Sequence, residues 1–220
     1  MKKRHVLLVC WVLCLATLAG AQTIVGSEHD LSSALPVSDR VCVFCHTPHQ
    51  PEGPPQINTY PLWNHTLSVV ASYGTYDSAT FDAGTGGAAL NTIADIGGGT
   101  ATSNLCMSCH DGTVGLGSLY NDPNIAGGEE TPTNSATFIS GTADMGSDLT
   151  NDHPINFDYS NALFAADGEL VDPASGTVAP LLFAGKVQCS SCHDVHDPTY
   201  VPFLVKDNAA SALCLTCHIK

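Results

Sequence analysis

Basic side chains are scarce in this sequence. Its 220 residues include 7 Lys and Arg against 21 Asp and Glu, so the formal net charge is −14. A polyanion of this kind lacks the positive electrostatic footprint that binds nucleic acid or an anionic membrane surface. We therefore expect no nucleic acid among its partners.

Charged residues of either sign are also few, at 13%, whereas hydrophobic residues make up 44%. Simple disorder needs the opposite balance, with high charge and low apolar content, and is excluded. The 20 Gly and 13 Pro follow no repeat, which excludes a collagen-like chain.

The longest apolar run lies at the N-terminus and predicts an export signal. Three basic residues (2–4) precede a short apolar stretch (6–18), and residues 19–21 read Ala-Gly-Ala, which fits a cleavage site. The stretch falls short of the roughly 20 residues that a bilayer span needs. We expect residues 1–21 to be removed, leaving 22–220 as a single domain without a membrane span.

The mature chain would keep four basic residues and all 21 acids, a net charge of −17. Its eight cysteines form four copies of C-x-x-C-H. Motif 1 contains Cys42, Cys45 and His46; motif 2 contains Cys106, Cys109 and His110; motif 3 contains Cys189, Cys192 and His193; and motif 4 contains Cys214, Cys217 and His218.

This motif is the attachment signature of c-type haem. Two thiols reach the vinyl groups on one porphyrin edge and form thioethers, and the adjacent imidazole binds iron on the proximal side. Disulfides need no His after each pair, and zinc sites do not ask for one beside the second Cys. Thioredoxin-like redox pairs need a βαβ context that is absent here. We therefore predict four covalently bound haem c groups.

Histidines outside the motifs are candidate distal ligands of iron. Met is the alternative distal ligand and raises the potential, but only Met107 and Met145 remain, and Met107 lies inside motif 2 on the wrong side of its own haem. We predict bis-histidine ligation for most or all haems, with one candidate spare. The candidates are His29, His49, His65, His153 and His196.

Two of these candidates lie three residues beyond a motif histidine. His49 follows His46, and His196 follows His193, in a C-H-x-x-H pattern. Each is too near to reach the far face of its own haem. Each can reach the distal face of a neighbouring haem, so we expect two haems in close contact.

Regular secondary structure is expected to be sparse, because Gly, Thr, Asn, Asp and Ser dominate the long interval between motifs 2 and 3. Short helices are predicted at 103–109 and 209–216, the second capped by Asn208. Short strands are predicted at 136–139 and 155–159. The fold class is a multihaem cytochrome c, mostly loops with few short helices and strands around a chain of four haems.

In the order and spacing of its motifs, the chain resembles the extracellular tetrahaem cytochromes of the OmcE type, which assemble into conducting filaments. Besides the motifs, the resemblance rests on GSEHDLS (26–32), VFCHTPH (43–49), LWNH (62–65), NDHP (151–154) and LCLTCH (213–218). It implies bis-histidine haems in an unbroken chain, stacked in parallel and T-shaped pairs. It also implies one distal histidine supplied by the neighbouring subunit, for which the N-terminal His29 is a candidate.

These features favour electron transfer without catalysis, because bis-histidine iron has no open coordination site. We expect a head-to-tail homopolymer outside the cell or at its surface, exchanging electrons with other redox proteins or extracellular acceptors. The net negative charge predicts negative midpoint potentials. A soluble periplasmic tetrahaem shuttle shares every local feature and is the alternative. A multihaem reductase is less favoured, because it needs an open iron and usually a C-x-x-C-K motif.

Overall fold

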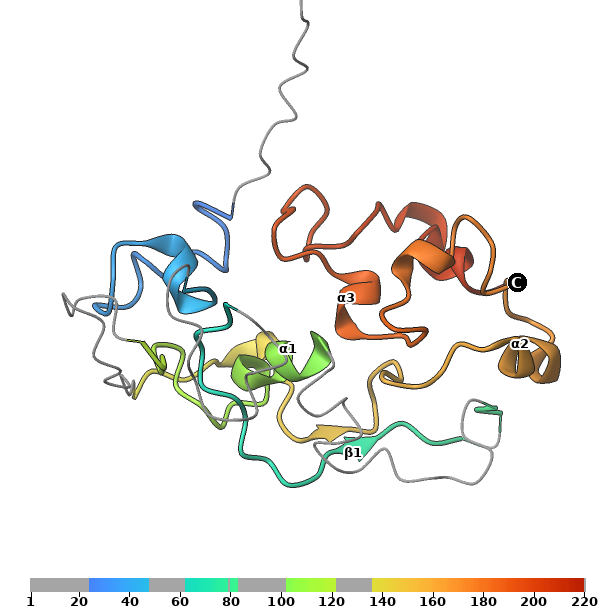
Figure 1. The fold of residues 1–220 in the computed structure, drawn as a ribbon, viewed down its shortest axis with the longest axis horizontal. Helices are drawn as coiled ribbons and strands as arrows, with labels where there is room; N and C mark the ends of the chain where they lie inside the picture. The colour runs from blue at the N-terminus through green and yellow to red at the C-terminus, as the bar shows by residue number, and fades with distance from the viewer. Residues whose placement is uncertain (1–23, 48–61, 79, 83–101, 122–135, 220) are drawn as a thin grey trace, which may run out of the picture.

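The computed structural model describes residues 24–47, 62–78, 80–82, 102–121 and 136–219 (Figure 1). The predicted signal segment 1–21 lies outside the described residues. Regular elements are few and short in the described parts, as the fold class predicts. None of the helices there has the length and apolar character needed to cross a membrane.

Three α-helices and two very short strands form the regular framework of the described chain. The helices are α1 (Thr102–His110), α2 (Asn161–Asp167) and α3 (Cys189–Cys192), and the strands are β1 (Gly74–Thr75) and β2 (Asp148–Leu149). Single 3₁₀ turns are η1 (Val41–Phe44), η4 (Gly141–Ala143), η5 (Ala179–Leu181), η6 (Ala209–Ser211) and η7 (Cys214–Thr216). β1 pairs with β2 in parallel, with Gly74 opposite Asp148 and Thr75 opposite Leu149.

The helix predicted at 103–109 is confirmed as α1. The continuous helix predicted at 209–216 is wrong, because Ala210 and Ser211 have φ angles of 52° and 63°, in the left-handed region that breaks a helix. Asn208 does not cap η6. Its side-chain oxygen instead accepts a hydrogen bond of 3.1 Å from the N–H of Leu213, just before η7.

Both strands predicted from the sequence are wrong. Residues 136–139 adopt no regular structure, and all but Ile139 are exposed. The alternation of polar and apolar side chains in this segment therefore does not correspond to a buried and an exposed face. Within 155–159, Asn156 has a φ of 59°, which interrupts an extended strand. The segment retains one isolated bridge, between Asp158 and Lys186.

Apolar side chains gather in three small clusters of buried residues, each of which contains or touches a C-x-x-C-H motif. Phe44 belongs to motif 1, Met107 to motif 2, and Cys217 of motif 4 packs against the third cluster. The clusters are Leu35, Phe44 and Leu119; Tyr73, Met107 and Leu149; and Tyr159, Leu163, Leu170, Val178 and Val187.

A buried polar network joins α1 to α3. The Ser103 hydroxyl donates to Gln188 Oε1 at 2.5 Å and accepts from the N–H of Cys189 at 3.0 Å. The amide nitrogen of Gln188 donates to Asn156 Oδ1 at 2.9 Å. Because Ser103, Gln188 and Asn156 are all buried, each bond replaces a lost contact with water.

We predict that Ser103→Ala destabilises the protein by about 1–3 kcal/mol, because it removes a hydrogen bond from the buried Gln188 oxygen and another from the Cys189 N–H. The measurement is the free energy of unfolding in denaturant, followed by circular dichroism. Ser33→Ala, at an exposed serine, is the control. Equal stability of the two variants would contradict the role assigned to the network.

Candidate cofactor-binding sites

All four C-x-x-C-H motifs fold as a helical turn, although the regular elements around them differ. Motif 1 lies on η1, motif 2 at the end of α1, motif 3 on α3 and motif 4 on η7. In three motifs the histidine N–H donates to the carbonyl of the first cysteine: His46 to Cys42 (2.8 Å), His193 to Cys189 (3.0 Å) and His218 to Cys214 (2.9 Å). A helical turn places side chains three and four positions apart on one face, so both thiols and the imidazole can face one group.

The eight motif cysteines are free thiols, and thiols of successive motifs lie close to one another. Motifs 2 and 3 meet where Cys106 hydrogen-bonds Cys189; this bond, aided by the Ser103 hydroxyl, lowers the pKa of Cys189 to about 7. Motifs 1 and 2 meet at Cys45 and Cys109. Burial raises the pKa of Cys109 to about 12, and the nearby Cys45 adds to the rise.

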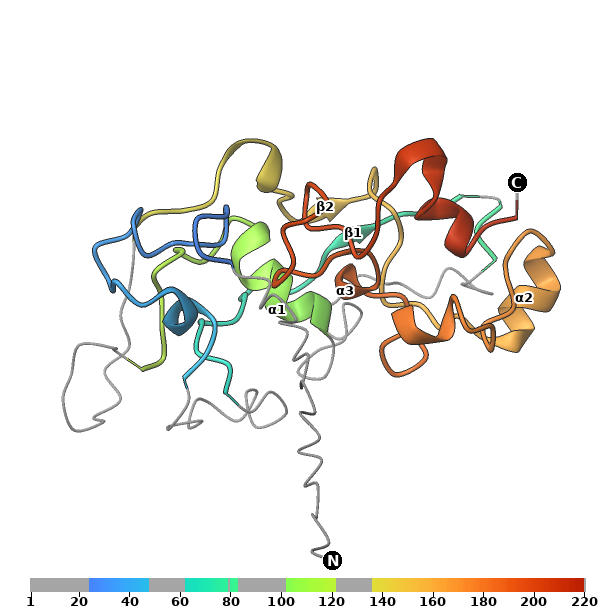
Figure 2. The ribbon, with the colours of Figure 1, turned by 90° about the horizontal axis from the view of Figure 1, so that it is seen from above.

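Motifs 3 and 4 meet in the same way. Burial raises the pKa of Cys192 to about 11, and Cys217 and Cys214 add to that rise. The thiols therefore form a line from motif 1 to motif 4. Figures 1 and 2 show the same order along the long axis, with η1 in blue at one end, then α1, α3 and the red C-terminal turn.

Three motif histidines lie beside a histidine from outside the motifs. The ring centres are 6.2 Å apart for His46 and His196, 6.1 Å for His110 and His29, and 6.4 Å for His218 and His153. The ring centres of two imidazoles on opposite sides of one metal ion lie roughly 6 Å apart, because this separation includes two metal–nitrogen bonds of about 2 Å each and half of each ring. The spacing therefore fits a metal between each pair.

Hydrogen bonds on the second ring nitrogen prepare several of these imidazoles for a metal. Nδ1 of His110 bonds the carbonyl of Ala143 at 2.7 Å, Nδ1 of His193 bonds that of Pro202 at 2.9 Å, and Nδ1 of His153 bonds that of Pro154 at 2.8 Å. A neutral imidazole that donates from Nδ1 keeps the Nε2 lone pair for a metal.

Burial also keeps two paired imidazoles neutral. It lowers the pKa of His29, where the nearby His110 adds to the effect. It lowers the pKa of His46 as well, and His196 adds to that shift. A neutral imidazole is the form that binds a metal.

His65 is placed differently from the other candidates. Its ring is buried, with Nδ1 2.8 Å from the carbonyl of Thr66 and Nε2 3.2 Å from that of Gly115. Nε2 also lies 3.4 Å from the sulfur of Cys109. His49 lies outside the described residues. The ring contacts among the described residues give His193 no second imidazole.

The structure adds one element that sequence reasoning missed, a clamp on His110 formed by the end of η4 and the residues that follow it. The Ala143 carbonyl accepts from the ring, and the N–H of Met145 donates to the His110 carbonyl at 2.8 Å. Gly112, with a φ of +71°, lets the chain turn there, and a Cβ on it would lie 2.8 Å from Asp144 Oδ1. Gly112 itself, two residues after the motif histidine, is the available sequence signal.

Asn64 is a second missed residue, which holds the turn of motif 1. It is fully buried, and its side-chain nitrogen donates to the carbonyl of Val43, inside the motif, at 2.7 Å. Its oxygen accepts from the N–H of Asn121 at 2.9 Å. Asn64 thus ties motif 1 to the segment that follows motif 2.

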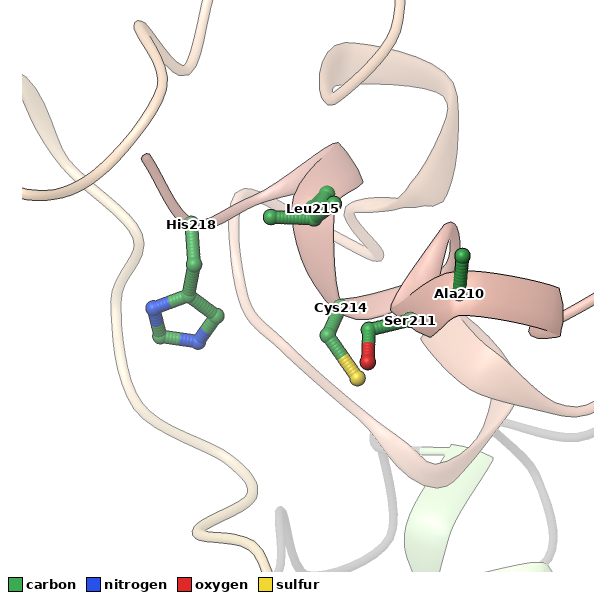
Figure 3. Close-up of a pocket in the computed structure, with 5 residues that line it drawn as sticks. All are labelled: Ala210, Ser211, Cys214, Leu215 and His218. Carbon is green, nitrogen blue, oxygen red and sulfur yellow. The ribbon is translucent and has the colours of Figure 1, made fainter. Parts of the chain in front are cut away.

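Motif 4 borders an open cavity of about 440 Å³. Figure 3 shows the Cys214 thiol and the His218 imidazole extending to the same side of the C-terminal turn. The lining residues are Ala210, Ser211, Cys214, Leu215 and His218. A thiol and an imidazole on the wall of one cavity fit the way a C-x-x-C-H motif holds haem.

Comparison with known families points to the same chemistry. Residues 182–220, which contain motifs 3 and 4, match the family described as the doubled CXXCH motif. No curated protein matches the chain. The doubled motif binds haem c through thioether bonds, and it indicates a multihaem c-type cytochrome that transfers electrons.

Proposed function

We propose that the chain binds four haem c groups, each ligated by two histidines, and transfers electrons along them. The observation that carries the proposal is the pairing of three motif histidines with outside histidines at 6.1 to 6.4 Å. Covalently anchored haem would supply one-electron chemistry. The protein residues would hold it, set its axial ligands and tune its potential.

The ring pairs support a proposal for which two histidines ligate each iron, a question that the sequence spacing of the histidines left open. The haem of motif 1 takes His46 and His196, that of motif 2 takes His110 and His29, and that of motif 4 takes His218 and His153. His196 follows motif 3, so its pairing with His46 would make it a ligand of a haem other than that of its own motif.

The haem of motif 3 keeps His193 and takes its second ligand from His49 or from a neighbouring subunit. His65 is the spare candidate, because its two ring nitrogens already face backbone carbonyls. The position of His29 beside His110 of the same chain favours a ligand within the chain over the expected role between subunits.

Two axial histidines leave no coordination site for a substrate, so we assign an electron carrier and not a reductase. A reductase needs one haem with an open distal side. The proposed ligand pairs close that side at motifs 1, 2 and 4.

We predict that the haem-loaded protein is wholly low-spin and that His196→Ala turns about one haem in four high-spin, because it opens one iron. His29→Ala and His153→Ala should do the same. Electron paramagnetic resonance measures the high-spin fraction. His65→Gln is the control and should stay low-spin. A high-spin signal in His65→Gln but not in His196→Ala would overturn the assignments.

We further propose that the protein is exported, loses residues 1–21 and acts as the repeating subunit of an extracellular filament for long-range electron transport. The resemblance to filament cytochromes supports this, and so does the placement of motifs 1 and 4 at opposite ends of the thiol line. Cys42 and Cys214 are exposed at these ends. Ile219, directly after motif 4, leaves apolar surface there and is 58% exposed.

We predict uniform filaments when the haem-loaded mature protein from the extracellular fraction is viewed by electron microscopy. Ile219→Asp should shorten or abolish them, because it places a charge on the apolar end surface. Val69→Asp, at a residue 79% exposed and outside every motif, is the matched control. Discrete monomer-sized particles at all concentrations would favour the periplasmic shuttle instead.

A further inference from the structure

A buried carboxylate stands immediately after the histidine of motif 2. Asp111 is 4% exposed. Its Oδ2 accepts from the hydroxyl of Tyr73 at 2.7 Å and from that of Ser68. Its Oδ1 accepts from the N–H and the hydroxyl of Thr113 at 2.9 and 2.7 Å. Every partner is a neutral donor.

Both oxygens of Asp111 act as acceptors, which is the hydrogen-bonding capacity of a carboxylate. Lys and Arg take no part: the ion pairs among the described residues join Lys186 to Asp158 and His196 to Asp194. The other titratable groups near Asp111 are His65, Cys109 and Tyr73. The negative charge of Asp111 is therefore shared among hydrogen bonds but not neutralised by a basic side chain.

Asp194 occupies the same sequence position in motif 3, directly after His193, but its side chain is 50% exposed. Water screens a charge there. A charge that acts through partly buried protein is about fourfold stronger at a given distance than one that acts through water. The two motifs share a sequence pattern, C-H-D, and differ in the electrostatic effect of its last residue.

We propose that Asp111 lowers the midpoint potential of the haem at motif 2. The inference rests on the proposed function, since it places a haem at that motif. A fixed negative charge stabilises the ferric form, which carries one more positive charge than the ferrous form. Motif 2 stands between motifs 1 and 3 in the line of thiols, so an electron crossing the chain passes through this haem.

The test is a spectroelectrochemical titration of the haem-loaded Asp111→Asn variant, which removes the charge and keeps the shape. We expect one of the four redox transitions to shift to a more positive potential while the other three stay in place. NMR of the haem methyl groups during the titration assigns the shifted transition to motif 2. Asp77→Asn removes the same charge from an exposed position and should move no single transition.

Tyr73→Phe separates electrostatics from structural disturbance. It deletes one hydrogen bond to the carboxylate, so the negative charge is less compensated by nearby donors. The same transition should therefore shift to a more negative potential. A purely structural effect would move the transition in the same direction in both variants and would overturn the inference. Four unchanged transitions, or four equal shifts, in Asp111→Asn would also overturn it.

Haem content and spin state are measured first on the wild-type protein. Fewer than four haems, or a high-spin fraction, contradicts the proposed function. Four low-spin haems with an unmoved motif 2 transition in Asp111→Asn contradict only the role of Asp111.

Discussion

The hydrogen bond from a motif histidine N–H back to the carbonyl of the first cysteine is the constraint on which the structure depends. It closes one helical turn in motifs 1, 3 and 4, and α1 closes the equivalent turn in motif 2. Each turn collects two thiols and an imidazole on one face, which is the arrangement that covalent haem attachment needs. The described residues between the turns have little regular structure, and many of their contacts position the turns.

Polar side chains position the turns as much as apolar packing does. Among the described residues, the buried apolar side chains form three small clusters. Ser103 and Gln188 join motifs 2 and 3, and Asn64 ties motif 1 to the segment after motif 2. Directional hydrogen bonds specify position more closely than apolar contact, which is non-directional. This suits a chain in which the spacing of successive redox groups matters more than a deep core.

Prediction of secondary structure succeeded where residue types alone favour a helix. It failed where individual residues adopt a left-handed backbone conformation. α1 follows from its sequence. The helix expected at 209–216 breaks because the backbone of Ala210 and Ser211 is left-handed. Neither residue type favours that conformation, so the sequence does not indicate it. The strand expected at 155–159 fails at Asn156 for a similar reason. A short alternation of polar and apolar residues is a weak indicator of a strand unless one face of the segment is buried.

Residue types and spacings of three or four residues are enough to establish the four motifs, the five candidate distal histidines and the acidic character of the chain. Three other features became visible only in the folded chain: His196 meets His46, His65 lies buried between carbonyls, and Asp111 is buried while Asp194 is exposed. These outcomes join segments far apart in the chain. Long-range packing sets them, and no local pattern encodes long-range packing.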